Sequence, residues 1–146
     1  VMEVLKFSFD EINVMSRLIA SRVKDYNFTS VLGIARGGVI PATVISYELD
    51  VPLLTCGVSS YNNKEKNELN ITQDIKIDSL PKDSNLLIVD DICDTGETIQ
   101  WLSNRLTLGG VKHTKVCVFT KPKHTKYLDH YASVVPEDKW IVFPWE

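Results

Sequence analysis

The sequence predicts an α/β fold, in which a mostly parallel sheet is flanked by helices and followed by a small C-terminal hood. Three observations favour this class. Short apolar runs of branched residues alternate with segments that carry apolar residues at helical spacing. The run Leu86–Val89 ends abruptly in Asp90 and Asp91, as expected of a central strand whose carboxyl end meets a ligand. A chain of 146 residues can build one core but is short for two, so we expect one domain over residues 1–146.

The first third of the chain predicts a helix, a strand and a second helix. The segment Ser8-Phe9-Asp10-Glu11 has the pattern of a capping box, and apolar residues at helical spacing continue to Val23. The run Val31–Ala35 is typical of a short buried strand. The glycine turn Arg36-Gly37-Gly38 then leads into a helix near Pro41–Leu49.

The middle of the chain predicts a strand followed by a mobile loop. Leu53–Ser59 has the composition of a second strand. The polar run Tyr61–Glu68 has neither a helical nor a strand period, so we expect a flexible loop at about residues 61–70. Isoleucines at positions 71, 75 and 77 suggest a short strand that returns from this loop.

The last part of the chain predicts two further strands around a helix. The strand Leu86–Asp90 is followed by a helix over Thr98–Leu108, which ends at a pair of glycines, and by the strand Lys115–Thr120. The tail, residues 131–146, is rich in valine, proline and tryptophan. We expect it to form a hood over the site or an edge strand.

Composition argues against several classes of protein. The formal net charge of −3 does not indicate the basic surface of a nucleic-acid-binding protein, so we expect no nucleic-acid partner. No segment resembles a signal peptide or a membrane span. The three cysteines, Cys56, Cys93 and Cys117, form no CxxC pair, and we interpret them as reduced, buried thiols of a cytoplasmic protein.

The segment Asp94-Thr95-Gly96-Glu97-Thr98 lies where a loop becomes a helix. Amides at a helix N-terminus are unsatisfied donors, and a glycine lets the backbone approach an anion closely, so this turn can hold a phosphate. Turns of this kind also often do no more than cap a helix. The neighbouring Asp90 and Asp91 favour the ligand-binding interpretation, because they can hold sugar hydroxyls or a Mg²⁺ ion.

The segment Ile88–Gly96 resembles the phosphoribosyl pyrophosphate signature of the type I phosphoribosyltransferases: two apolar residues, two acids, two variable positions and Asp-Thr-Gly. The resemblance is greatest to the bacterial xanthine-guanine phosphoribosyltransferases. It extends, in the same order along the chain, to Ile34–Gly38, Ser59–Tyr61, Phe119–Pro122, Asp138–Ile141 and Pro144-Trp145.

This resemblance implies a purine-salvage enzyme that transfers phosphoribosyl from 5-phosphoribosyl 1-pyrophosphate (PRPP) to a 6-oxopurine: guanine, xanthine or hypoxanthine. It implies that Asp94 is catalytic and handles the proton of the purine imidazole ring. It also implies that Asp90 and Asp91 hold the ribose hydroxyls and organise Mg²⁺ as the cofactor. Relatives form oligomers, so we expect a homodimer or homotetramer.

The resemblance assigns each remaining site residue either to PRPP or to the base. Arg36 and Gly37 would form a pyrophosphate loop, in which the family often has a non-proline cis peptide. The 5′-phosphate would be bound mainly by backbone amides of Thr95, Gly96, Glu97 and Thr98. At the base, Lys121 would donate to the 6-oxo group, Trp140 would stack, and Ile141 would make backbone contacts.

Two positions depart from the family pattern. Val142 stands where the xanthine-guanine enzymes have an acidic residue, so its side chain cannot accept from a 2-amino group. Asn67 replaces an arginine of the flexible loop and leaves Lys64 and Lys66 as the nearby cations. These departures put the preferred base and the strength of pyrophosphate binding in doubt.

Two alternative functions remain open from the sequence. The chain can be a regulatory protein that uses the same fold to bind PRPP and contacts RNA or DNA, because fold alone does not establish activity. It can also be a phosphoribosyltransferase for another base, such as a pyrimidine.

Overall fold

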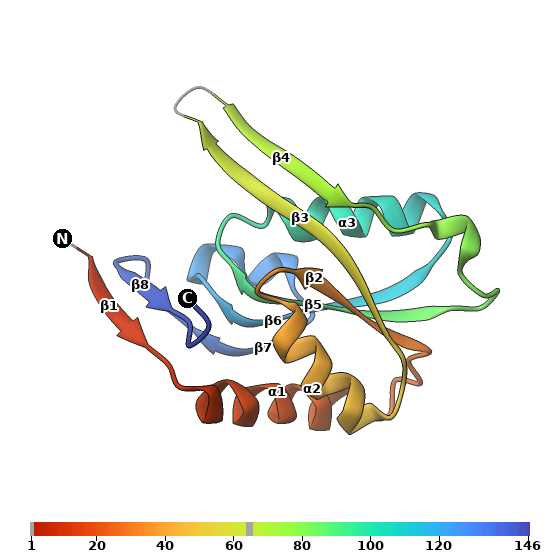
Figure 1. The fold of residues 1–146 in the computed structure, drawn as a ribbon, viewed down its shortest axis with the longest axis horizontal. Helices are drawn as coiled ribbons and strands as arrows, with labels where there is room; N and C mark the ends of the chain where they lie inside the picture. The colour runs from red at the N-terminus through yellow and green to blue at the C-terminus, as the bar shows by residue number, and fades with distance from the viewer. Residues whose placement is uncertain (1, 64–65) are drawn as a thin grey trace.

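The computed structural model describes residues 2–63 and 66–146, and its centre is a six-stranded sheet with the order β4-β3-β2-β5-β6-β7 (Figure 1). The strands of this sheet are β2 (Ser30–Ala35), β3 (Leu53–Asn63), β4 (Lys66–Gln73), β5 (Asn85–Cys93), β6 (Lys112–Thr120) and β7 (His130–Val134). All neighbours pair in parallel except β3 and β4, which are antiparallel. The predicted mostly parallel sheet is therefore confirmed.

Three helices cover the two faces of the sheet: α1 (Phe9–Val23), α2 (Val39–Leu49) and α3 (Glu97–Leu108). In β5, Leu87 and Val89 pack with α1 and α2, whereas Leu86 and Ile88 pack with α3. Successive side chains of a strand point to opposite faces, so an uninterrupted apolar run is what a strand between two helical layers requires. Figure 1 shows α1 and α2 on one side of the sheet and α3 on the other.

The start of α1 follows the predicted capping box. The Glu11 amide donates to Ser8 Oγ at 3.1 Å, and the Ser8 amide donates to Glu11 Oε1 at 3.1 Å. Two backbone donors that the helix cannot satisfy by itself are thereby paired. Two short 3₁₀ segments, η1 (Ile77–Ser79) and η2 (Pro122–Tyr127), complete the helical content of the described residues.

The predicted loop at residues 61–70 is wrong as regards secondary structure, because β3 continues to Asn63 and β4 begins at Lys66. The ladder between them runs from the pair Gly57 and Gln73 to the pair Asn63 and Lys66. Backbone groups form such a ladder, so a two-stranded ribbon needs no apolar alternation. Lys64, one of the expected cations, lies outside the described residues, and the expected mobility of the segment stays a prediction. The return strand begins and ends earlier than expected, so that of the three isoleucines only Ile71 lies in it and Ile75 and Ile77 follow its end at Gln73.

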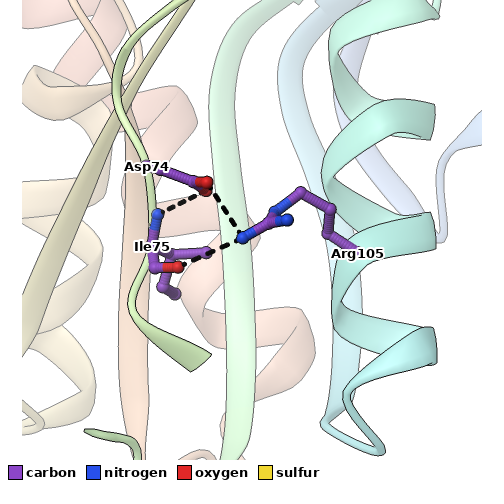
Figure 2. A network of polar contacts seen from close by, with 3 residues as sticks. All are labelled: Asp74, Ile75 and Arg105. Carbon is purple, nitrogen blue, oxygen red and sulfur yellow. Dashed lines mark hydrogen bonds and ion pairs between the residues drawn. The ribbon is translucent and has the colours of Figure 1, made fainter. Parts of the chain in front are cut away.

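A polar network ties the end of this hairpin to α3 (Figure 2). Arg105 Nη2 lies 2.9 Å from Asp74 Oδ2, and Asp74 Oδ1 accepts a hydrogen bond from the Ile75 amide at 2.8 Å. The guanidinium carbon of Arg105 also lies 5.4 Å from the centre of the Trp101 ring on the same helix. The return strand is thus attached to the helix whose N-terminus carries the predicted phosphate turn.

A second, two-stranded sheet joins β1 (Glu3–Lys6) in parallel to β8 (Lys139–Val142). Residues 3–6 were not expected to form a strand. The tail combines the two expected arrangements, because β7 is the edge strand of the large sheet and β8 belongs to the separate ribbon seen beside β1 in Figure 1. In the described part of the chain, no helix has the length and apolar character needed to cross a membrane.

Candidate active site

The carboxyl end of β5 carries two adjacent acids that are largely withdrawn from solvent. Asp90 Oδ1 accepts a hydrogen bond from the Asp91 amide at 2.8 Å, and Asp91 Oδ1 accepts one from the Ile92 amide at 2.8 Å. Burial raises the pKa of Asp90 well above its ordinary value, and the charge of Asp91 adds to this effect. Burial also raises the pKa of Asp91. The site therefore holds carboxyl groups that would be favoured in their charged form by a bound cation.

The donor set at these acids fits Mg²⁺ only in combination with a substrate. Among the described residues, no group of three His, Cys, Asp or Glu side chains is placed to hold a metal ion. Mg²⁺ is commonly held by one or two carboxylates, with water and phosphate oxygens completing its octahedron. Asp90 and Asp91 supply two such carboxylates, so the residues fit an ion that arrives with a phosphorylated ligand.

The turn that follows β5 leads directly into the N-terminus of α3. Gly96 has φ = 83° and is the N-cap of the helix, a conformation that L side chains rarely adopt. A Cβ on Gly96 would lie 2.4 Å from Cδ2 of the Tyr127 ring. The Glu97 amide donates to Thr95 Oγ1 at 3.3 Å. The turn is thus shaped so that first-turn amides of α3 can face an anion.

The loop after β2 approaches the acids so closely that it leaves no room for a side chain. The peptide bond Ala35–Arg36 is cis, as the family resemblance implied for this loop. A Cβ on Gly37 would lie 2.0 Å from Asp91 Oδ2. Glycine at this position therefore brings the loop backbone against the carboxylate, while the neighbouring Arg36 is exposed at the rim.

Lys121 is a buried residue at the end of β6, with only 6% of its surface exposed. Its Nζ donates to the carbonyl oxygen of Pro136 at 3.0 Å and to that of Lys139 at 2.6 Å. An ammonium group has three hydrogens, so these two bonds leave one donor free. Two hydrogen bonds from the tail therefore hold the side chain in a fixed orientation.

Two hollows meet at the centre of these elements, one of about 220 Å³ and one of about 650 Å³. The smaller hollow is lined by the predicted ribose and phosphate residues Asp90, Thr95, Gly96 and Thr98. The larger one is lined by the predicted base residues Lys121, Trp140 and Ile141. Arg36, Gly37, Asp91 and Asp94 line both. The fold thus brings all predicted site residues but Glu97 together, and Glu97 lines an adjoining hollow with Thr95 and Gly96.

Sequence reasoning missed part of the wall of the larger hollow. Four further residues from the segment expected only as a hood line it: Lys139, Phe143, Trp145 and Glu146. The rings of Phe143 and Trp145 stack with centroids 4.8 Å apart, and Glu146 Oε1 accepts from the Phe143 amide at 2.9 Å. The alternation of aromatic residues at 143 and 145 was the available signal for this wall.

Comparisons with known proteins identify the family of the chain. The family described as "Phosphoribosyl transferase domain" matches residues 9–146. The chain is 31% identical to the xanthine-guanine phosphoribosyltransferase of Idiomarina loihiensis and 34% identical to that of Desulfotalea psychrophila, in each case covering 95% of this chain and 84% of the relative.

Its fold also superposes on the crystal structure of a purine phosphoribosyltransferase from Pyrococcus horikoshii. The TM-score is 0.86 at 31% sequence identity, and the match covers 99% of this chain and 95% of that structure. The sequence signature, the parallel sheet with its paired acids and these likenesses point in one direction. The chain belongs to the phosphoribosyltransferase family.

Proposed function

We propose that the protein is a purine-salvage phosphoribosyltransferase. It would transfer the phosphoribosyl group of PRPP to a 6-oxopurine and release pyrophosphate. The observation that carries this proposal is that the phosphate hollow and the base hollow meet at Asp94, Asp91 and the Arg36–Gly37 loop. A base and a sugar phosphate bound in the two hollows would have their reacting atoms at this junction.

In this proposal the smaller hollow binds the phosphoribosyl group. Amides at the start of α3, with the hydroxyls of Thr95 and Thr98, would hold the 5′-phosphate. Asp90 and Asp91 would accept hydrogen bonds from the ribose hydroxyls. A Mg²⁺ ion bound through these acids would neutralise charge on the pyrophosphate.

The junction carries the chemical step of the proposal. The bond between C1 of the ribose and the pyrophosphate oxygen breaks as a nitrogen of the base forms its bond to C1. Backbone amides of the Arg36–Gly37 loop and the Arg36 guanidinium would stabilise the leaving pyrophosphate. Asp94, which is exposed to both hollows, would take the proton that the imidazole ring of the base loses.

The larger hollow would select the base. The free hydrogen of the Lys121 ammonium would donate to the 6-oxo group of an oxopurine. The 6-amino group of adenine is itself a donor, so it could not accept this hydrogen bond and would lie against a cation. Trp140, half exposed on the wall, would stack on the purine, and Ile141 would contribute backbone contacts. Val142 supplies no acceptor for a 2-amino group, so we expect little preference for guanine over hypoxanthine.

An ultraviolet assay of nucleotide formation tests the proposal. PRPP and Mg²⁺ are incubated with guanine, xanthine, hypoxanthine, adenine or uracil, and each reaction is repeated with EDTA in place of Mg²⁺. We expect turnover of oxopurines that EDTA abolishes. Turnover of uracil alone would establish the other-base alternative, and binding of PRPP without turnover of any base would favour the regulatory protein.

The finer expectations from the sequence stay predictions. A homodimer or homotetramer is expected because relatives form oligomers, and light scattering in solution would measure the mass of the assembly. The three cysteines are buried and unpaired, as expected of thiols in a cytoplasmic protein.

A further inference from the structure

We propose that the strand β1 is a positioning element for base recognition, and that it acts through the contact of Glu3 with Lys139 on the orientation of Lys121. This inference rests on the proposed function, because it concerns the lysine expected to read the 6-oxo group. It assigns a role to residues 3–6, which line neither hollow. The argument follows a chain of contacts from β1 to the free hydrogen of the ammonium group.

The first contact is the pairing of β1 with the strand that carries the base residues. β8 holds Trp140 and Ile141, and within the described residues its only strand partner is β1. Val4 stands opposite Trp140 and Leu5 opposite Ile141 in the ladder. β1 therefore supplies the backbone ladder that fixes the register of β8, while Ile141 of β8 also packs in the core with residues of β6.

The second contact fixes the beginning of β8. Glu3 and Lys139 are opposite each other in the ladder, and their side chains form an ion pair between Glu3 Oε2 and Lys139 Nζ. The Lys139 amide also donates to the carbonyl oxygen of Pro136 at 3.1 Å, which closes the turn before the strand. The backbone of Pro136–Lys139 is thus held at the register position that Glu3 defines.

The third contact passes this position on to Lys121. Both hydrogen bonds that hold the Lys121 ammonium end on this turn, at the carbonyl oxygens of Pro136 and Lys139. Two fixed hydrogens of a tetrahedral ammonium determine the direction of the third. A displacement of the turn would therefore redirect the hydrogen that faces the base.

The other end of β1 is attached to the strand from which Lys121 extends. The Phe7 amide donates to the carbonyl oxygen of Val142 at 3.3 Å, and the Phe7 ring lies 4.7 Å, centroid to centroid, from that of Phe119 in β6. β1 thus connects the strand that carries the lysine with the strand that carries the stacking tryptophan. It sets the relation between the two groups that would read the base.

The test is a charge swap with separate KM values for the two substrates. Glu3→Lys should raise the KM for hypoxanthine by about two- to fivefold, as befits a partly exposed ion pair, and leave the KM for PRPP within about twofold. The double variant Glu3→Lys with Lys139→Glu should restore the hypoxanthine KM toward the wild-type value. Val4→Pro, which disrupts the strand itself, should raise that KM by about tenfold or more.

The matched control is Glu48→Gln, which removes the exposed ion pair between Glu48 and Arg17, with no path to either hollow, and should leave both KM values unchanged. An unchanged hypoxanthine KM in Glu3→Lys and Val4→Pro, with an active wild type, would overturn the inference and leave the proposed function standing. Equal increases in the KM values for hypoxanthine and PRPP would show that β1 has only a general structural role, and would also overturn the inference. A wild type that uses no base at all would overturn the proposed function, and this inference with it.

Discussion

The two ends of the proposed site, the phosphate end that would bind the phosphoribosyl group and the base end that would bind the purine, are built in different ways. The phosphate end comes mainly from one continuous segment, Asp90–Thr98, which runs from a central strand into a helix. The base end is assembled from two stretches distant in sequence, the end of β6 and the turn and strand of the tail, and the tail strand in turn pairs with β1. Local sequence therefore encodes the phosphate end, whereas long-range pairing creates the base end.

The two ends also differ in how their buried charges are compensated. Asp90 and Asp91 at the phosphate end are largely withdrawn from solvent, and this raises the pKa of both, so a bound cation would stabilise their charged form. The Lys121 ammonium at the base end already has two carbonyl partners. The charges at the phosphate end would thus be compensated only when a cation and substrate bind, whereas the ammonium at the base end already has protein partners.

The largest expected effect concerns the junction between the two ends. Asp94→Asn should lower kcat by about 10²- to 10⁴-fold, because the amide cannot take a proton from the base. The Kd for PRPP, measured by calorimetry, should change little, since the phosphate amides and the two acids stay in place. An undiminished kcat would remove Asp94 from the chemical step and make it one more wall residue.

Lys121→Met should damage the base end alone. The loss of a charge-assisted hydrogen bond is expected to lower kcat/KM for oxopurines by roughly 10- to 100-fold and to reduce discrimination against adenine. The variant removes the side-chain donor from the Lys139 carbonyl group and one of the two donors from the Pro136 carbonyl group. Steady-state kinetics with hypoxanthine and adenine measure both effects. A rise in the KM for PRPP of similar size would contradict the division of the site into two ends.

Gly37→Ala should damage the phosphate end alone. A methyl group there would collide with the Asp91 carboxylate, so we expect the KM for PRPP to rise by about tenfold. Gly110→Ala is the control, because Gly110 also departs from ordinary side-chain conformations, with φ = 71°, but has no atom within 4 Å of the added carbon. It should lower Tm and leave both KM values unchanged. An unchanged KM for PRPP in Gly37→Ala would show that the loop tolerates the added methyl group.

The smallest expected effect is on stability and its dependence on pH. The pKa of Asp90 is raised above its ordinary value of 3.8, so the folded protein binds this proton more tightly than the unfolded chain. The protonated Asp90 side chain therefore contributes to the stability of the folded protein below pH 3.8, and this contribution is lost as the pH rises through the pKa of Asp90 in the folded state. Asp90→Asn should therefore be about 1 kcal/mol more stable than the wild type at neutral pH without ligand, although it binds PRPP poorly.

Thermal unfolding between pH 4 and pH 8 measures this difference. The excess stability of Asp90→Asn should grow with pH, whereas Asp25→Asn, at an exposed position, should follow the wild type throughout. Equal Tm values for Asp90→Asn and the wild type at every pH would show that the acid is solvated in the free protein. Addition of Mg²⁺ and PRPP should raise the Tm of the wild type above that of Asp90→Asn.

The elements that depend on local patterns were predictable from the sequence. The capping box at Ser8, the apolar run before Asp90 and the glycine turn at Gly96 each carry a signal within a few residues. The turn that we propose to bind phosphate could be located in the sequence for the same reason. The resemblance to a family supplied Lys121, Trp140 and Ile141, which by themselves resemble ordinary strand-end and half-buried residues.

The features that escaped prediction depend on contacts between distant segments. Residues 3–6 are too few for a periodic pattern and become a strand only because Lys139–Val142 lies beside them. The polar hairpin of β3 and β4 gains its ladder from the backbone, which leaves no trace in the side chains. The carbonyl groups that hold Lys121 belong to a turn whose place above β6 no local pattern encodes.

The pairing of β1 with β8 has a consequence for the order in which the protein acquires its abilities during synthesis. Glu3 and Lys139 are 136 residues apart, and the closure of so long a loop requires almost the entire chain. The strands of the large sheet are complete in sequence at Val134, before β8 has been made. Residues 3–6 are therefore made long before the strand with which they pair. A growing chain can therefore form the turn proposed to bind phosphate before it can complete the proposed base end.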